Sequence, residues 1–156
     1  MTNRFKDEEE IRALVNAFEA CTINPEEFKH FQHLTVALWY LAHDPYEEAA
    51  EKMRNGIQKL AAAYGKMGYH ETVTEFWLRM VWRFIGEAPP TESIMSVTNR
   101  LIADDDNKER IYEYYSSELL NSAEAKSSWV EPDLKPLPPV ITSSAHRPAS
   151  QPASAE

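Results

Sequence analysis

The chain has 156 residues, which is enough for one domain with a single hydrophobic core. Its 16 Lys and Arg residues against 25 Asp and Glu residues give a formal net charge of −9. Such a surface repels phosphate backbones, so nucleic-acid binding is not expected. The sequence has no run of about 18 apolar residues and no secretory leader, so we expect a cytoplasmic protein without a membrane partner. A single cysteine excludes an intramolecular disulfide.

The first half of the chain has the pattern of three amphipathic helices. From residue 7 to residue 20, apolar side chains recur at i, i+3, i+4 and i+7, which is the spacing of one helical face. Asn24-Pro25-Glu26-Glu27 combines a capping asparagine, a proline and a glutamate three residues after the cap, so we expect a second helix from there to about residue 42. Asp44-Pro45 repeats this pattern and should begin a third helix, which ends near Gly65.

The second half begins with its most apolar segment, residues 71–86, whose apolar side chains cover most of a helical circumference. This fourth helix should therefore be the central one. A fifth helix is expected from about residue 91. A sixth should follow Asp106, which can act as a cap with Glu109 three residues later, and a short turn at 122–128 extends it.

This pattern predicts an all-α, single-domain bundle of about six helices over residues 1–130. After that point the composition changes, because six of the ten prolines lie in residues 131–156. We expect residues 131–141 to form an extended, proline-rich strap that Trp129, Leu134 and Leu137 hold against the domain. Residues 142–156 should be a disordered tail.

Three histidines and one carboxylate stand out as candidate site residues. His30 and His33 are three residues apart on a predicted helix, so both can reach one metal ion. His70 and Glu71 follow a glycine-containing turn at the start of the most buried helix, where a positive helix end keeps an imidazole neutral. Glu27 and His30 have the spacing used in carboxylate-bridged di-iron bundles, but no second such pair occurs, so a di-iron site is disfavoured.

Several motifs resemble those of a family of small uncharacterised bacterial proteins. The likeness covers roughly residues 10–139 and implies a compact helical fold with His30, His33, His70 and Glu71 as the signature polar positions, but no reaction. The motifs are Phe28-x-His30-x-x-His33-Leu34, then Ala37 and Tyr40-Leu41, then Gly68-Tyr69-His70-Glu71-Thr72-x-Thr74, then Tyr115-Ser116-x-Glu118-Leu119-Leu120, and Trp129-Val130-Glu131-Pro132-Asp133-Leu134-x-Pro136-Leu137-Pro138.

Two functional hypotheses follow. In the first, His30, His33, His70 and Glu71 bind Fe(II), Mn(II) or Zn(II) with a coordination position left for water, which would suit a metalloenzyme acting on a small molecule. Without a metal, His70 and Glu71 could form a catalytic acid/base pair instead. In the second hypothesis the protein is an interaction or regulatory module, and its histidines only hold helices together.

Overall fold

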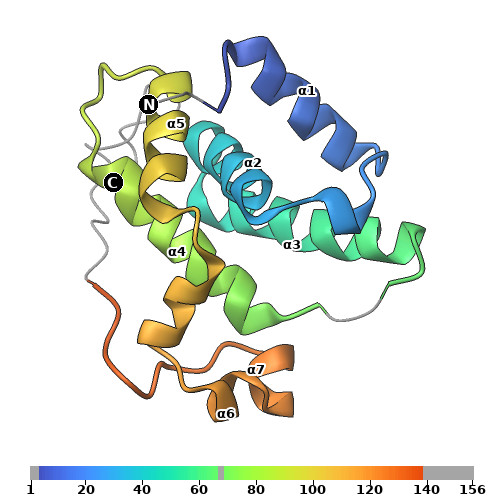
Figure 1. The fold of residues 1–156 in the computed structure, drawn as a ribbon, viewed down its shortest axis with the longest axis vertical. Coiled ribbons are helices and arrows are strands. Elements are labelled where there is room, and N and C mark those ends of the chain that lie inside the picture. The colour runs from blue at the N-terminus through green and yellow to red at the C-terminus, as the bar shows by residue number, and fades with distance from the viewer. Residues whose placement is uncertain (1–3, 67–68, 139–156) are drawn as a thin grey trace.

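The computed structural model describes residues 4–66 and 69–138, which are helical and contain no strand, so the prediction of an all-α fold is confirmed (Figure 1). The tail at 142–156 lies outside the described residues. In chain order the elements are α1 (Glu8–Glu19), the 3₁₀ helix η1 (Pro25–Glu27), α2 (His30–His43), α3 (Tyr46–Ala63), α4 (Glu71–Glu87), α5 (Ile94–Asp105), the 3₁₀ helix η2 (Lys108–Glu113), α6 (Ser117–Leu120) and α7 (Ala123–Ser127).

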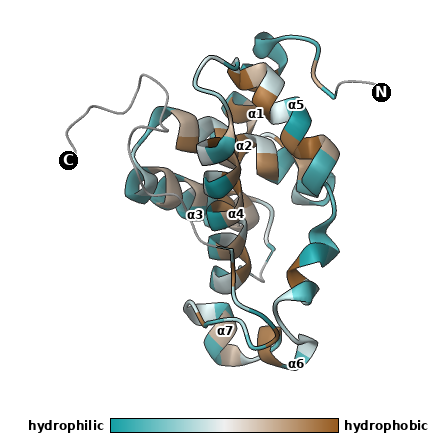
Figure 2. Ribbon diagram, turned by 90° about the vertical axis from the view of Figure 1, so that its left-hand side faces the viewer, coloured by the Kyte–Doolittle hydropathy of each residue, from teal (hydrophilic) through white to brown (hydrophobic). Residues whose placement is uncertain are grey.

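Two helices share the centre of the molecule. Helix α2 packs against α1, α3, α4 and α5, and α4 packs against α2, α3, α5 and α7. Leu34, Val36, Leu38 and Leu41 of α2 are all at most 1% exposed, so the second predicted helix is as central as the fourth. The outer helices carry hydrophobic and hydrophilic residues on different sides, which Figure 2 shows as brown and teal alternating along their ribbons. Among the described residues, no helix combines the length and hydropathy needed to cross a membrane.

The start of the second helix differs from the prediction. Asn24 does act as a cap, since its Oδ1 accepts a hydrogen bond from the Glu26 amide at 2.9 Å, but the turn that follows is only the three-residue η1. The backbone at Phe28 leaves the helical region, with φ −88° and ψ 86°, and buries its ring in the core. Helix α2 then begins at His30. Burial of the Phe28 side chain therefore separates η1 from α2, where the capping pattern predicted one continuous helix.

Helix α3 ends as expected and lies unusually close to α1. Gly65 has a φ of +67°, and the amide of Lys66 donates to the carbonyl of Ala61 at 2.8 Å, which is the left-handed ending that favours glycine. Further back in the helix, a Cβ added at Gly56 would overlap the Phe18 ring, so glycine is required for the close packing of α1 on α3.

The predicted sixth helix is divided into three short pieces. After η2, the hydroxyls of Ser116 and Ser122 each accept a hydrogen bond at 3.1 Å from the backbone amide three residues later in the chain. These two caps begin α6 and α7 as separate helices. Serine hydroxyls compete with helical hydrogen bonds in this way, so the apolar spacing did not produce one continuous helix.

Residues 129–138 run back along these short helices. The Tyr115 hydroxyl donates to the Val130 carbonyl at 2.7 Å, and the Leu134 amide donates to the Tyr114 carbonyl at 2.9 Å. The expectation that the Leu134 side chain pins this segment is wrong, because it is 56% exposed; its main chain makes the contact instead.

Candidate functional site

A cavity of about 670 Å³ lies between the central helices α2, α3 and α4 and the two 3₁₀ helices. Its interior is predominantly apolar and includes aromatic rings. The apolar lining residues are Phe28, Leu34, Ala37, Met53, Ile57, Val73, Trp77, Leu78, Ile111 and Leu120. His30, His33 and His70 line the same cavity, together with Tyr69 and Thr74.

His33 lines this cavity from the start of α2, and its ring packs on Phe28 with the ring centroids 4.1 Å apart. Burial is the main cause that lowers the pKa of His33 to about 4; the neighbouring His30 acts in the same direction and the backbone at Phe28 in the opposite one. The imidazole is therefore neutral at pH 7. A neutral imidazole has one N–H donor and one nitrogen that can accept a hydrogen bond.

His30 lies at the first position of α2, at the edge of the same cavity. Its Nε2 donates to the Asp105 carbonyl at 3.2 Å, which joins α2 to the end of α5, and its ring meets Trp77 edge-on at 4.5 Å. Burial lowers the pKa of His30, while the hydrogen bond to Asp105 acts in the opposite direction. His30 is thus also kept neutral, with one nitrogen engaged.

His70 is the N-cap of α4, and both of its nitrogens are engaged. Its Nδ1 accepts from the Val73 amide at 3.2 Å, and its Nε2 donates to the Leu120 carbonyl at 2.7 Å. These two bonds fix the neutral tautomer with the proton on Nε2. His70 therefore caps its own helix and ties that helix to α6.

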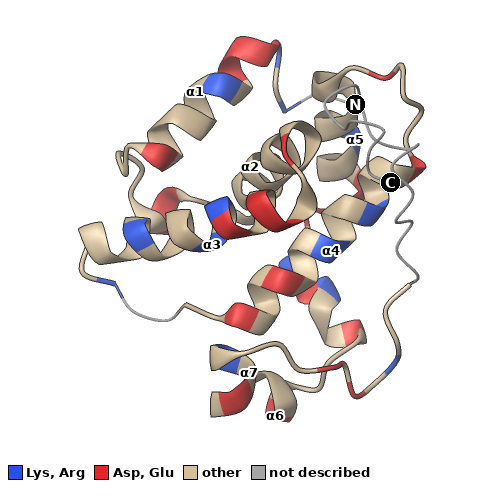
Figure 3. Ribbon diagram, turned by 180° about the vertical axis from the view of Figure 1, so that it is seen from behind, with Lys and Arg blue, Asp and Glu red and all other residues tan. Residues whose placement is uncertain are grey.

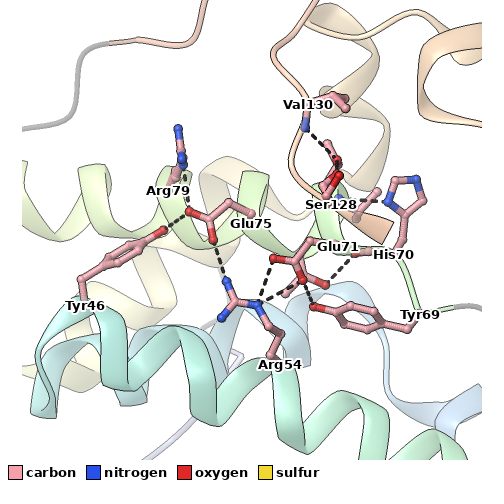
Figure 4. Close-up of polar contacts among 12 residues, drawn as sticks. Tyr46, Arg54, Tyr69, His70, Glu71, Glu75, Arg79, Ser128 and Val130 are labelled. Atoms are coloured by element: carbon pink, nitrogen blue, oxygen red, sulfur yellow. Dashed lines mark hydrogen bonds and ion pairs between the residues drawn. The ribbon is translucent and has the colours of Figure 1, made fainter. Parts of the chain in front are cut away.

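Glu71 is directed away from the cavity histidines. In Figure 4 its carboxylate points toward Arg54 and Tyr69, whereas the His70 ring points toward the C-terminal segment. Arg54 Nε lies 3.0 Å from Glu71 Oε2, and the Tyr69 hydroxyl donates to Oε1 at 2.6 Å. Burial and this hydrogen bond raise the pKa of Tyr69 well above its ordinary value, so the phenol stays protonated.

The same arginine belongs to a larger ion-pair network on α3 and α4. Arg54 Nη2 lies 3.2 Å from Glu75 Oε1, and Glu75 Oε2 accepts from Arg79 Nε at 2.9 Å and from the Tyr46 hydroxyl at 2.8 Å (Figure 4). Figure 3 shows the acidic and basic residues of this face following one another along α4. Glu75 is only 7% exposed and is fully paired, so the network joins α3 to α4, and loss of one partner would leave a charge there uncompensated.

The structure therefore brings three of the four predicted site residues to one cavity and places the fourth outside it. Within the described residues, no group of three or more His, Cys, Asp or Glu side chains is arranged to hold a metal ion. His70 has no free lone pair, and Glu71 is engaged by Arg54 and Tyr69. The residues do not fit a four-ligand metal centre in this conformation, and that centre stays a prediction from the sequence.

Several lining residues had no part in the sequence interpretation. Lys29, Lys108 and Tyr112 are exposed residues at the mouth of the cavity. Lys29 could have been recognised from its place beside His30, but Lys108 is some 80 positions away, and only the fold brings η2 to the same cavity. The Glu75–Arg79 pair was readable from its i, i+4 spacing.

Comparison with models of known protein families, with curated proteins and with solved structures finds no match for this chain. The resemblance to a family of small bacterial proteins thus stays a prediction. Any function has to be argued from the cavity and the side chains around it.

Proposed function

We propose that this protein binds a small organic molecule with a largely apolar, aromatic body in the cavity between α2, α3 and α4. The observation that carries the proposal is the cavity itself, about 670 Å³ in volume and lined by apolar and aromatic side chains together with a comparable number of polar and charged ones. Sites for small ligands typically have volumes of about 300–1,000 Å³ and combine apolar walls with polar groups that orient the ligand. Trp77 and Phe28 supply ring faces for an aromatic ligand.

The polar contacts would come from His33 and Thr74. A neutral His33 has one ring nitrogen that can accept a hydrogen bond from a ligand hydroxyl or amine. The Thr74 hydroxyl, which donates to the His70 carbonyl at 2.9 Å, can itself accept one. A ligand with a hydrogen-bond donor on an aromatic ring fits these groups.

The test uses 2-naphthol, a neutral bicyclic aromatic with one hydroxyl, and isothermal titration calorimetry. Ala37 lines the cavity and is buried, so Ala37→Leu adds bulk to the binding space. We expect the wild type to bind 2-naphthol and Ala37→Leu to bind it at least about tenfold more weakly, with a melting temperature no lower than that of the wild type.

The matched control is Ala63→Leu, the same change at an exposed residue of α3, which should bind like the wild type. Equal affinity of Ala37→Leu and wild type would overturn the proposal. So would the absence of any binding to the wild type.

The two hypotheses from the sequence can be separated by elemental analysis of untagged protein. About one equivalent of Fe, Mn or Zn, lost in a His33→Ala and His70→Ala double variant, would support a metal site over the cavity ligand proposed above. The contacts of His70 and Glu71, which are all within the protein, support structural roles for these two residues.

A further inference from the structure

We infer that the cavity prefers monoanionic ligands, namely a carboxylate attached to the aromatic body, with the carboxylate held at the mouth by Lys29 and Lys108. This inference rests on the proposed function and specifies its ligand class.

The two lysines at the mouth have no ion-pair partner among the described residues. Both are exposed and line the cavity, and neither ammonium group is within ion-pair distance of a described carboxylate. In a chain of net charge −9, most other basic side chains of α3, α4 and α5 do have such partners. Unpaired cations at the entrance of an apolar cavity fit a ligand that has an anionic end.

Two carboxylates share this mouth and must be counted. Glu26 is neutralised by Lys66, whose Nζ lies 2.7 Å from its Oε2. Glu109 lies beside Lys108 and has no ion pair with a described residue. Two ammonium groups against one free carboxylate leave about one positive charge, which matches a carboxylate better than a doubly charged phosphate monoester.

The start of α2 adds to this positive field. Its N-cap residue is Lys29, whose ammonium has no lone pair and cannot accept from the first amides of the 14-residue helix. Gln32 Oε1 accepts from the Lys29 amide at 2.8 Å, and among the described residues no side chain accepts from the amides of His30 and Phe31. Lys29 and His30 both line the cavity, so the N-terminus of α2, the positive end of its dipole, lies at the mouth of the cavity.

The charge of Lys108 acts on His30, a side chain that lines the cavity. Burial is the main cause that lowers the pKa of His30; the hydrogen bond to Asp105 and the charge of Asp106 act in the opposite direction, and the charge of Lys108, the smallest of these effects, also lowers it. Because His30 is neutral, it carries no charge that would compete with Lys108 for a carboxylate. An anion is thus compatible with the histidines as well as with the lysines.

The test compares 6-hydroxy-2-naphthoate with 6-hydroxy-2-naphthamide, which differ only in the charged group. We expect the wild type to bind the acid at least about tenfold more tightly than the amide at low salt, and less selectively at 0.5 M salt. In the Lys29→Gln and Lys108→Gln double variant the two compounds should bind equally, while the affinity for the amide stays near that of the wild type. A double variant with Lys59→Gln and Lys126→Gln carries the same charge change at exposed residues outside the cavity and should keep the preference.

Each contrary outcome has its own meaning. If the amide binds as tightly as the acid, or if both double variants keep the preference, the inference is overturned and the proposed pocket stands. Tighter binding of 2-naphthyl phosphate than of the naphthoate would overturn the choice of a carboxylate. If neither naphthalene compound nor 2-naphthol binds, the proposed function fails, and this inference fails with it.

Discussion

Acidification should destabilise the fold through His33, and the size of the effect follows from its surroundings. An unfolded histidine has a pKa of about 6.5, whereas burial lowers the pKa of folded His33 to about 4. Between these values the unfolded chain binds a proton that the folded chain does not. The stability given by the neutral ring is therefore present above about pH 6.5 and is lost as the pH falls towards about 4. Proton linkage gives about 2.5 kcal/mol between pH 7 and pH 4.5, an upper value because water in the cavity would screen part of the charge.

The assay is urea unfolding of the wild type, His33→Phe and His43→Gln at several pH values from 7 to 4.5. Phenylalanine cannot ionise, and its ring keeps the packing against Phe28. The free energy of unfolding of the wild type should fall by about 2.5 kcal/mol more than that of His33→Phe over this range. His43 is an exposed histidine of the same helix, so its replacement controls for the loss of a histidine outside the cavity and should give a pH dependence parallel to that of the wild type.

The reasoning is refuted if His33→Phe and the wild type lose stability in parallel, to within about 0.5 kcal/mol. Direct titration by NMR gives a second check. A His33 ring that takes up its proton near pH 6.5 in the folded protein would mean that the cavity hydrates the ring as bulk water does.

Three further substitutions test the packing around the cavity by urea unfolding at pH 7. Gly56→Ala should cost about 1–3 kcal/mol, because its methyl group would overlap the buried Phe18 ring, and a gain in stability from helix propensity would contradict this. Thr72→Val should cost about 1–3 kcal/mol and speed hydrogen exchange at the Val130 amide, because the Thr72 hydroxyl bonds the C-terminal segment twice, at 2.8 and 3.3 Å; unchanged exchange would show that this tie is dispensable. Glu75→Gln should cost about 3 kcal/mol, because it leaves the two arginines that Glu75 pairs with facing a neutral group, and a loss no larger than that of an exposed glutamate would argue against a stabilising network.

The helices that the sequence predicted well are those whose apolar period and end signals agree. Helix α1 has an apolar face of four buried side chains and begins where Asp7 accepts from the Glu10 amide at 3.1 Å. Helix α3 ends at the glycine expected there. In these segments the local signals are sufficient, because no distant residue competes for the same backbone groups.

The errors lie where tertiary packing overrides a local pattern. Phe28 is taken into the core beside Phe18, with ring centroids 5.1 Å apart, and this interrupts the helix that Asn24 begins. The stretch after Asp106 has an apolar period, but Tyr114 and Tyr115 are both buried next to Phe76 directly after the 3₁₀ helix η2. These contacts of Tyr114 and Tyr115 with a distant helix could not be read from the apolar period alone.

The sequence predicted which histidines gather at the candidate site, but not which groups they and Glu71 bind. The sequence predicted that His30, His33 and His70 lie together, and these three side chains do line one cavity. It could not reveal that the Leu120 carbonyl, 50 residues further along, accepts from His70. Nor could it reveal that Arg54 engages Glu71. Both partners are set by packing between helices distant in sequence, and residue type alone indicates only what a side chain can bind.

The three cavity histidines differ in how many nitrogens the protein itself uses, and this difference favours the proposed organic ligand over a metal. His70 uses both nitrogens, so it contributes rigidity to the wall. His30 uses one, on the Asp105 carbonyl, and neutral His33 has one nitrogen that can accept a hydrogen bond. A metal centre needs lone pairs from at least three side chains that converge on one point, whereas an organic ligand needs a shaped apolar space and a few polar groups at separate positions. Two remaining nitrogens, spread along an aromatic wall that ends at two unpaired lysines, meet the second requirement.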